Sequence, residues 1–432
     1  MSSLPKLRLS EFSDSNTYCM HKFDDIFSFS SGKNIKQNES SPEFSTPCVR
    51  YGELYHMYGE VITKTINNTN LEHSELTFSA GNEILLPSAG EDPLDIGSAS
   101  ALTLEGVAIG RTINVLRPKG TIDYSHIYVS YYINEKLRKR ISQLARGASI
   151  SNVYNSDLKS LDAWLPSLSE QQKIASFLSK VDEKIALLTE KKVKLSEYKK
   201  GVMQQLFNGS FQEQDGKLVF VPPTLRFKAD DGSEFPDWEE VSLGSITTAM
   251  QSGISRQLHS EDIGYPILRS NNLSEGKVSF EDLKYWHLTD DQGADLTRYI
   301  LEEGDLLVNF INSLSQIGKV AIYYNSMGRD VIYTTNIMRL KFNSLITSEF
   351  AFYSFNTRRY VNFIQSIAKP AVSQASFTTV DFKKYKMHVP TRAEQNKMTS
   401  LLLAIDKKIE LINTELEKAK EWKKGLLQQM FV

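Results

Sequence analysis

The sequence predicts an α+β protein in which two globular domains are separated by two long antiparallel coiled-coil helices, with an internal pseudo-twofold repeat. Three observations predict this fold. Residues 165–207 and 389–431 align without a gap at a shift of 224 (389 minus 165). Apolar residues in both copies recur in steps of four and three. The remaining sequence mixes strand-like and helical runs.

The globular parts are predicted at residues 1–164 and, together with the linker between the halves, at 209–388. Strand-like runs such as EILLP, VAIGRTINVL, DLLVNF and VIYTTNIMRL are punctuated by Gly and Asn turns and mix with helical stretches. We therefore expect each domain to be α+β. The Gly- and Pro-containing segment 208–224 is the expected linker.

The long helices are predicted at residues 165–208 and 389–432. Each copy opens with a proline, Pro166 or Pro390, and then Glu-Gln, and it continues without another proline, which is a helix start followed by a long helix. Such a helix, roughly 37 residues or ~55 Å long at 1.5 Å per residue, exceeds one small domain. The alternative is that each helix lies on its own globular domain.

Steps of four and three residues are typical of a coiled-coil seam, and two matched seams in one chain can pack against each other. Lysines interrupt both seams, Lys192 and Lys199 in the first and Lys423 in the second. The predicted seam comprises Ile174, Leu178, Val181, Ile185, Leu188, Leu195, Leu402, Ile405, Ile409, Ile412 and Leu416.

Shorter repeats extend the duplication into the globular parts. PKLRLSEF at 5–12 recurs as PTLRF at 223–227, and PCVRYGEL at 47–54 parallels PILRSNNL at 266–273. These segments agree less well than the helices do. The two domains have therefore diverged while the helices have remained alike.

The composition favours a protein of the cytoplasm. The chain has 432 residues, 41% of them apolar, and a formal net charge of -2. Its two cysteines, Cys19 and Cys48, form no CxxC pair, which fits a reducing compartment. The N-terminus lacks the apolar run of a signal peptide, and we expect no membrane segment.

Motifs for catalysis are missing from the sequence. It contains neither an Asn/Asp-Pro-Pro-aromatic methyltransferase motif nor a GxxxxGK[S/T] phosphate loop, and its seven histidines show no metal-ligand spacing. Asp182-Glu183-Lys184 fits the tail of a nuclease motif, but these residues flank seam positions. We expect no catalytic residue and no metal site.

Two diverged domains on alike spacers suit two different readers held a fixed distance apart. Duplex DNA is the expected elongated partner, and a ~55 Å helix corresponds to roughly 16 base pairs. Half-site spacing would then follow from the geometry of the protein.

The chain resembles the specificity (S) subunits of Type I restriction-modification systems over nearly its whole length. The resemblance rests on PSLSEQ and PTRAEQ at the helix starts, on KKGVMQQLF and KKGLLQQMF at the helix ends, and on PILRSNNL and GDLL in the second half. The first half departs from it, with Tyr51-Gly52 where the second has Ser270-Asn271-Asn272.

The resemblance implies a non-catalytic subunit of a host-defence complex. Its two target recognition domains would read a bipartite asymmetric sequence in double-stranded DNA, and its helices would dock two methyltransferase (M) subunits that methylate adenine. Restriction/translocase (R) subunits would join them. S-adenosylmethionine, ATP and Mg are expected on the partner subunits, with no cofactor bound by this chain. The alternative is a coiled-coil scaffold without nucleic-acid binding.

Residues for DNA contact are sought among Arg, Lys, Asn and Gln in loops, because these side chains hold phosphates and read base edges in the major groove. The alternative for each is an ordinary solvated surface residue. The predicted DNA-binding residues are Lys33, Lys36, Arg50, Arg111, Arg146, Arg256, Arg269, Asn271, Asn272, Asn309, Asn312, Lys369 and Gln374.

Overall fold

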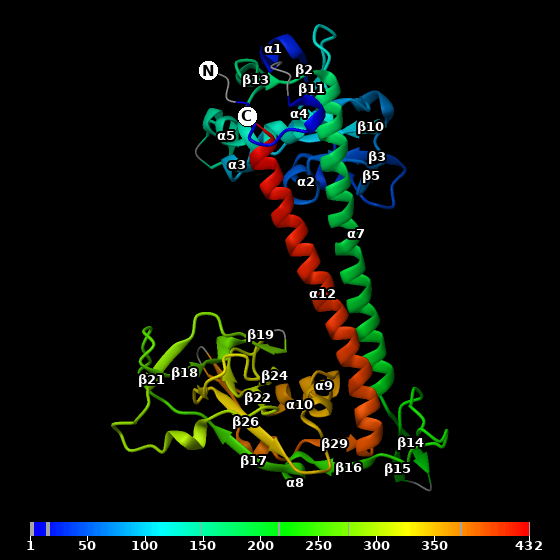
Figure 1. Ribbon diagram of the computed structural model, residues 1–432. Helices are drawn as coiled ribbons and strands as arrows, with labels where there is room; N and C mark the ends of the chain where they lie inside the picture. The colour runs from blue at the N-terminus through cyan, green and yellow to red at the C-terminus, as the bar shows by residue number, and fades with distance from the viewer. Residues whose placement is uncertain are drawn as a thin grey trace. The chain divides into compact units, whose positions relative to one another are not determined.

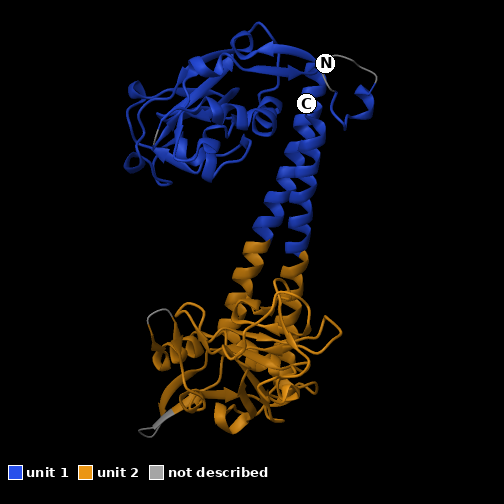
Figure 2. Cartoon of the chain, turned by 90° about the vertical axis from the view of Figure 1, so that its left-hand side faces the viewer, with its two compact units in different colours: residues 1–191, 412–432 blue, residues 192–411 orange. Residues whose placement is uncertain are grey.

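The computed structural model describes residues 4–13, 18–147, 149–214, 217–274, 276–371 and 374–431. The chain divides into two compact units (Figure 2). Unit 1 comprises residues 1–191 and 412–432, and unit 2 comprises residues 192–411. Each unit therefore contains one globular domain and a stretch of both long helices.

Unit 1 is built on a five-stranded sheet of order β2-β11-β7-β9-β4 and a four-stranded sheet of order β5-β3-β10-β6. β11 is antiparallel to both neighbours, with Leu116 opposite Phe29 and Ile84. The strands are β1 (Cys19–Lys22), β2 (Phe27–Ser31), β3 (Thr46–Val49), β4 (Val61–Ile62), β5 (Asn67–Thr69), β6 (Phe78–Ala80), β7 (Glu83–Pro87), β8 (Ala89–Gly90), β9 (Ser100–Leu102), β10 (Glu105–Ile109), β11 (Ile113–Pro118), β12 (Ser151–Asn152) and β13 (Asp162–Leu165). The short helices are α1 (Phe23–Ile26), α2 (Tyr51–His56), α3 (Pro93–Ile96), α4 (His126–Tyr132), α5 (Arg138–Leu144) and α6 (Asn155–Leu158).

Unit 2 repeats this plan with a four-stranded sheet of order β17-β26-β22-β24 and a three-stranded sheet of order β21-β18-β25. Its strands are β14 (Ser210–Gln214), β15 (Lys217–Val221), β16 (Glu239–Ser242), β17 (Thr247–Ser252), β18 (Gly264–Leu268), β19 (Leu273–Ser274), β20 (Lys277–Val278), β21 (Lys284–His287), β22 (Leu306–Asn309), β23 (Ile311–Asn312), β24 (Val320–Ile322), β25 (Ile332–Tyr333), β26 (Ile337–Phe342), β27 (Lys369–Pro370), β28 (Ala375–Ser376) and β29 (Lys386–Val389). The short helices are α8 (Leu243–Ile246), α9 (Ser348–Ser354), α10 (Arg358–Ile367) and α11 (Thr379–Phe382).

The two long helices are α7 (Leu168–Phe207) and α12 (Arg392–Met430), which lie side by side (Figure 1). In unit 1 the beginning of α7 packs with the end of α12, since Leu178 and Leu426 share one apolar core. In unit 2 the end of α7 packs with the beginning of α12, since Val202 and Leu402 share another. The helices are therefore antiparallel. This confirms the fold class predicted from the sequence.

The seam residues lie on the inner faces of this pair. Leu178 and Leu402 are fully buried. Ile185, Leu195 and Ile409 are half-buried. The remaining seam residues, all buried, are Ile174, Val181, Leu188, Ile405, Ile412 and Leu416. Full burial of one such leucine stabilises a fold by about 1.5–3 kcal/mol.

The predicted linker is more ordered than its composition indicated. β14 and β15 pair as an antiparallel hairpin, with residues 215–216 outside the described part of the chain. Phe220 on this hairpin stacks on the imidazole of His388, with ring centroids 3.5 Å apart. Aromatic packing therefore fixes this segment on unit 2. The Gly and Pro content of the segment does not predict that packing.

Candidate functional site

Each long helix begins at a buried ion pair. In unit 1 the guanidinium of Arg8 donates to both carboxylate oxygens of Glu170, at 2.9 and 2.6 Å. In unit 2 Arg226 donates to Glu394 in the same way, at 2.9 and 2.8 Å. Both glutamates are completely buried. The Glu of each Pro-xxx-Glu-Gln motif therefore binds an arginine that precedes its own domain.

The Gln of the same motif attaches the domain to the helix start. Gln171 accepts from the backbone N–H of Ser125 at 3.0 Å and donates to the carbonyl of Pro166. Gln395 accepts from the backbone N–H of Thr347 at 2.9 Å and donates to the carbonyl of Pro390. Ser125 and Thr347 are the N-caps of α4 and α9, so one buried amide fixes a domain helix against each long helix.

A second contact ties the unit 1 domain to both long helices. The hydroxyl of Tyr131 on α4 donates to Asp182 of α7 at 2.6 Å, and the ammonium of Lys423 on α12 pairs with Asp182 at 2.7 Å. Lys423 also pairs with Glu60 at 2.8 Å and lies over the Tyr131 ring. We call Tyr131, Asp182 and Lys423 the first joint.

Unit 2 contains the same arrangement, the second joint. The hydroxyl of Tyr353 on α9 donates to Asp406 of α12 at 2.7 Å, and Lys199 of α7 pairs with Asp406 at 2.6 Å and lies over the Tyr353 ring. Asp406 and Lys423 are the repeat equivalents of Asp182 and Lys199. Each joint therefore combines an aspartate from one repeat with a lysine from the other.

Titration shifts in the first joint follow from this geometry. Burial raises the pKa of the Tyr131 hydroxyl, and the adjacent Asp182 carboxylate raises it further. Burial opposes the charge of Lys423, but Glu60 and Asp182 outweigh it, so the pKa of this ammonium is raised. The joint is thus a charged ion pair with a neutral tyrosine donor. Asp182 of the Asp182-Glu183-Lys184 tripeptide is thus part of a contact between the long helices and the domain.

The ends of the long helices lie on the globular domains. Phe431, just beyond α12, packs on Tyr128 of α4, with ring centroids 5.1 Å apart. Phe207, at the end of α7, packs on Phe350 of α9 at 5.3 Å. The repeated KKGxxQQxF segments therefore supply two contacts each, a lysine to a joint and a phenylalanine to a domain.

Three of the predicted DNA-binding residues of unit 1 converge where strands end. Lys33 follows β2, Arg50 follows β3 and Arg111 follows β10, and backbone hydrogen bonds join these loops, from Lys33 N to Ile109 O at 3.0 Å and from Gly110 N to Val49 O at 2.9 Å. Lys33 and Arg111 are exposed. We call Lys33, Arg50 and Arg111 the strand-end cluster. Arg50 is half-buried and pairs with buried Glu53 at 2.8 Å. Lys36, in the next turn, is exposed beside Glu39.

A glycine permits this convergence. A Cβ at Gly32 would lie 2.1 Å from the carbonyl oxygen of Gly110, and a Cβ at Gly253 in unit 2 would lie 2.0 Å from that of Tyr333. Both glycines follow the equivalent strands β2 and β17. A side chain at Gly32 would separate the loops that carry the strand-end cluster, and one at Gly253 would separate the loop after β17 from β25.

The unit 2 arginines near the corresponding strand ends already have partners. Arg256 donates to both oxygens of Asp290, at 2.8 and 2.7 Å, which holds the pKa of that carboxyl far below its usual range. Arg269 pairs with exposed Asp282 at 2.8 Å. Asn271 is exposed beside Arg269. Both arginines are therefore already oriented by a carboxylate, and only their remaining N–H groups are available for a contact with DNA.

Two of the predicted DNA-binding residues are buried amides. Asn272 is 1% exposed, and its amide accepts from Arg269 N and donates to the carbonyls of Ser279 and Glu281. Asn309, on the buried strand β22, is also 1% exposed. Base reading needs an accessible edge, which neither amide has. Residue type alone did not reveal this burial.

The other predicted residues lie on small sheets beside the domain helices. Asn312 and Lys369 are on β23 and β27, which flank β28, and Gln374 closes the turn between β27 and β28. Lys369 and Gln374 are exposed. In unit 1 Arg146 lies opposite Asn152 of β12, is exposed, and pairs with Asp157 at 3.1 Å. The structure thus brings Asn312, Lys369 and Gln374 together.

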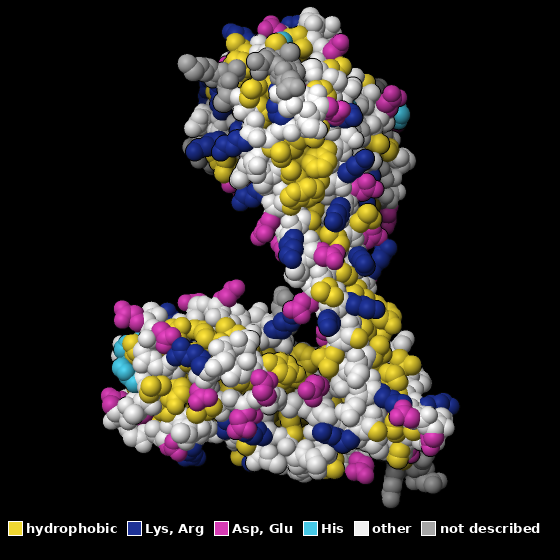
Figure 3. Space-filling model, viewed as in Figure 1, with side chains coloured by type: hydrophobic (Ala, Val, Ile, Leu, Met, Phe, Trp, Pro, Cys, Tyr) yellow, Lys and Arg dark blue, Asp and Glu magenta, His cyan; other side chains and the backbone are white. Residues whose placement is uncertain are grey.

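Basic and acidic side chains are interspersed over each unit on the face drawn in Figure 3. That pattern fits the formal net charge of -2. Within the described residues no group of three or more His, Cys, Asp or Glu could hold a metal ion. Among the helices described, none is long and apolar enough to cross a membrane.

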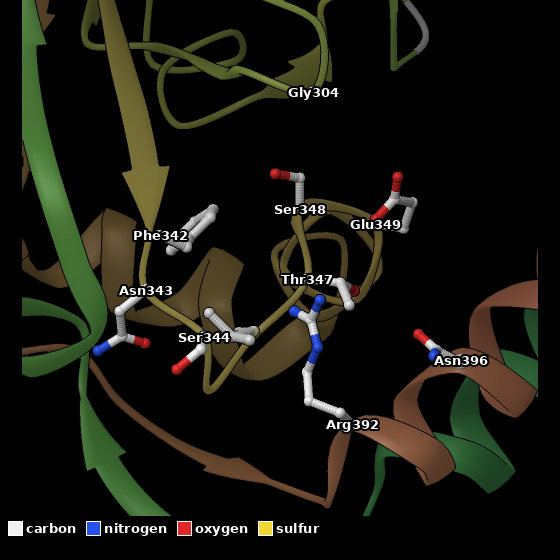
Figure 4. Close-up of a pocket in the computed structure, with 10 residues that line it drawn as sticks. Gly304, Phe342, Asn343, Ser344, Thr347, Ser348, Glu349, Arg392 and Asn396 are labelled. Atoms are coloured by element: carbon white, nitrogen blue, oxygen red, sulfur yellow. The ribbon is translucent and has the colours of Figure 1, made fainter.

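A polar pocket of about 530 Å³ lies where α12 begins. Arg392 extends from α12 toward Thr347 at the start of α9, and Glu349 and Asn396 also line the pocket (Figure 4). Because Arg392 and Glu349 carry opposite charges, the lining selects neither anions nor cations. We assign no ligand to it.

The model of the family described as "Type I restriction modification DNA specificity domain" matches residues 17–197 and 236–421, two copies that together cover most of the chain. The chain belongs to this family. Each of the two matched segments of this specificity-subunit family member contains one globular domain and most of the long helix that follows it.

Curated relatives are named as specificity subunits of type I restriction enzymes. The chain is 31% identical over 207 residues to the MjaX specificity subunit of Methanocaldococcus jannaschii, 48% of each chain. It is 24% identical to the EcoKI specificity subunit of Escherichia coli, covering 67% of this chain and 60% of that one. The chain thus spans about half to three-fifths of these relatives. It is 24% identical to the MjaVIII subunit of M. jannaschii, covering 80% and 77%.

Solved structures share the fold. A Type-I restriction-modification S subunit from M. genitalium aligns over 100% of this chain and 99% of its own, with a TM-score of 0.62 and 18% identity. A chain from a study of complex assembly and conformational transition of a type I system aligns over 96% of each, with a TM-score of 0.51 and 12% identity.

The sequence analysis did not identify Tyr131 and Tyr353, the domain residues of the two joints. Tyr131 and Tyr353 differ by 222 positions, close to the helix shift of 224, which was a usable signal. Arg8 and Arg226 likewise lie within the repeated segments that begin PKLR and PTLR. A repeat shows that residues correspond, but not which acidic group they bind.

Proposed function

We propose that this chain is the DNA-recognition subunit of a type I restriction-modification enzyme, with the domains of units 1 and 2 each reading one part of a bipartite, asymmetric sequence in double-stranded DNA. The observation that carries the proposal is the pair of family-model matches, each with its own globular domain. Divergent domains on alike helices fit two different half-sites. A coiled-coil scaffold without DNA binding would not account for the divergence of the two globular domains.

In this proposal the exposed members of the predicted set contact DNA. In unit 1 they are Lys33 and Arg111 of the strand-end cluster with Lys36 and Arg146. In unit 2 they are Asn271, Lys369 and Gln374. Long basic side chains suit phosphates and guanine, and the amides suit adenine. Arg50, Arg256, Arg269 and Asn312 could join them only from partly covered positions.

The chemistry belongs to partner subunits. Methyltransferase subunits carrying S-adenosylmethionine would modify adenine, and restriction/translocase subunits using ATP and Mg would cut unmodified DNA. This chain would bind no cofactor and act in the cytoplasm, in keeping with its free Cys19 and Cys48.

Exposed apolar residues on the long helices support docking of two methyltransferase subunits. Leu187 and its repeat equivalent Leu411 are 58% and 56% exposed. Tyr198 and its equivalent Trp422 are 57% and 51% exposed. Large apolar side chains that recur at equivalent exposed positions suit two copies of one partner.

Reconstitution with the methyltransferase subunits tests the proposal. We expect sequencing of methylated DNA to show adenine methylation at one bipartite sequence, only when this chain is present, and no methyl transfer by the chain alone. DNA binding by the complex should weaken steeply with salt. Methylation by the chain alone, or methylation without sequence preference, would overturn the proposal. Absence of DNA binding would favour the scaffold.

A further inference from the structure

Both joints have the same construction from three separate elements. The tyrosine comes from a domain helix, the aspartate from the long helix of the same repeat, and the lysine from the other long helix. The joint therefore fastens each domain to the helix pair and not to one helix. No other contact described above combines all three elements through charged or hydroxyl groups.

The hydroxyl-to-carboxylate bonds restrict orientation. Apolar packing tolerates small rotations of a domain on a helix, whereas a hydrogen bond of 2.6 or 2.7 Å to a fixed carboxylate needs a narrow range of angles. Tyr131 and Tyr353 are each 1% exposed, so neither can exchange its acceptor for bulk water without moving the domain. The joints thus fix the orientation of each domain, whereas the apolar cores hold the domain against the helices.

Lys199 and Lys423 are polar residues within the apolar seams of the two long helices. A polar residue in such a seam lowers stability relative to an apolar one, but it can select one geometry over alternatives. Both lysines reach their aspartates across the helix pair, at 2.6 and 2.7 Å. They also lie over the tyrosine rings at 5.5 Å.

We propose that the two joints are positioning devices that set the angle of each recognition domain on the helix pair, and thereby restrict the number of unread base pairs between the two half-sites. The effect on the number of unread base pairs rests on the proposed function. Tyr131 and Tyr353 are the residues that convert helix geometry into domain orientation.

The joints differ in one respect. Lys423 has a second carboxylate partner, Glu60, at 2.8 Å, and Glu60 belongs to the unit 1 domain. The first joint therefore keeps one domain-to-helix bond when the tyrosine hydroxyl is removed. In unit 2 Lys277 of the domain pairs with Glu410 of α12, but both side chains are more than half exposed, so loss of the Tyr353 hydroxyl should still have the larger effect.

A distance measurement tests domain orientation in the full chain. Spin labels at Val193→Cys on α7 and Val380→Cys on α11, both exposed positions of unit 2, would be placed in a Cys19→Ser background that retains buried Cys48. We expect a narrow distance distribution that broadens in Tyr353→Phe, which removes only the hydroxyl.

Tyr360→Phe is the matched control. Its hydroxyl is equally buried, but it donates to the Gly318 carbonyl within the same domain. This variant should lose stability without broadening the distribution. Equal widths for Tyr353→Phe and the unsubstituted chain, or equal broadening in both variants, would overturn the role of the joint.

Methylation of sites with altered gaps tests whether the joints restrict the number of unread base pairs. In complexes with the methyltransferase subunits, Tyr353→Phe should reduce the preference for the natural gap over gaps one base pair longer or shorter by about tenfold. Tyr131→Phe should reduce it less, and Tyr360→Phe should leave it unchanged. An unchanged gap preference together with a broadened spin-label distance distribution would show that the joints do not restrict the gap. If the unsubstituted complex methylates no bipartite site, the proposed function fails, while the distance measurement still decides the joint.

Discussion

Replacing Arg226 by alanine is expected to destabilise unit 2 by about 3–5 kcal/mol, since it leaves a buried carboxylate without a counter-charge. Glu394 is 0% exposed and receives two hydrogen bonds from this guanidinium. It also lies in the first turn of α12, at the start of the helix pair. The shift in the urea midpoint of the unit 2 transition measures the loss.

Lys228→Ala provides the control, two residues further along the same loop. Lys228 pairs with Glu234 at 2.8 Å, but both side chains are more than half exposed. Solvent screens such a pair, so its removal should not measurably move the midpoint. Equal shifts for Arg226→Ala and Lys228→Ala would show that burial of Glu394 does not determine the cost.

Placing a carboxylate on the exposed apolar sites of the helices is expected to remove the methyltransferase subunits. Leu187→Glu and Leu411→Glu should each weaken binding of one copy on the order of 100-fold. The leucine gains free energy when the contact buries it, whereas a buried carboxylate loses its hydration. The double variant should bind none. Native mass spectrometry of the reconstituted complex reads the stoichiometry directly.

Leu288→Glu is the matched substitution for this test. Leu288 is 64% exposed and directly follows β21, which lies on the side of the unit 2 domain remote from the long helices (Figure 1). Its variant should keep two methyltransferase subunits. Retention of both copies by the Leu187/Leu411 double variant would show that docking uses another surface.

Periodicity made the helices predictable. Spacing of Leu178, Val181, Leu402 and Ile405 fixes which face is apolar, and the matched repeat supplies its partner, so the antiparallel pair followed without tertiary information. The domain strands were recognised as a class but not in their order. Strand order depends on pairings between distant segments, such as β3 with β10, that local composition does not encode.

Contacts between distant residues limited the prediction of the site. Lys199 and Lys423 were noticed as seam interruptions, but their function depends on Tyr353 and Tyr131, which lie in the globular domains. The sequence presents Asn272 as a loop amide, and only the tertiary structure shows that its hydrogen bonds are satisfied internally. Arg256 likewise has a carboxylate partner that the sequence does not reveal.

Exchange of one recognition domain most directly tests whether each unit reads its own part of the target. Residues 1–164 would be replaced by the corresponding part of another specificity subunit, and methylated adenines would be mapped in DNA from cells that carry the complete system. We expect one half-site to change while the other half-site and the gap stay the same. A change in both half-sites, or in neither, would contradict this expectation.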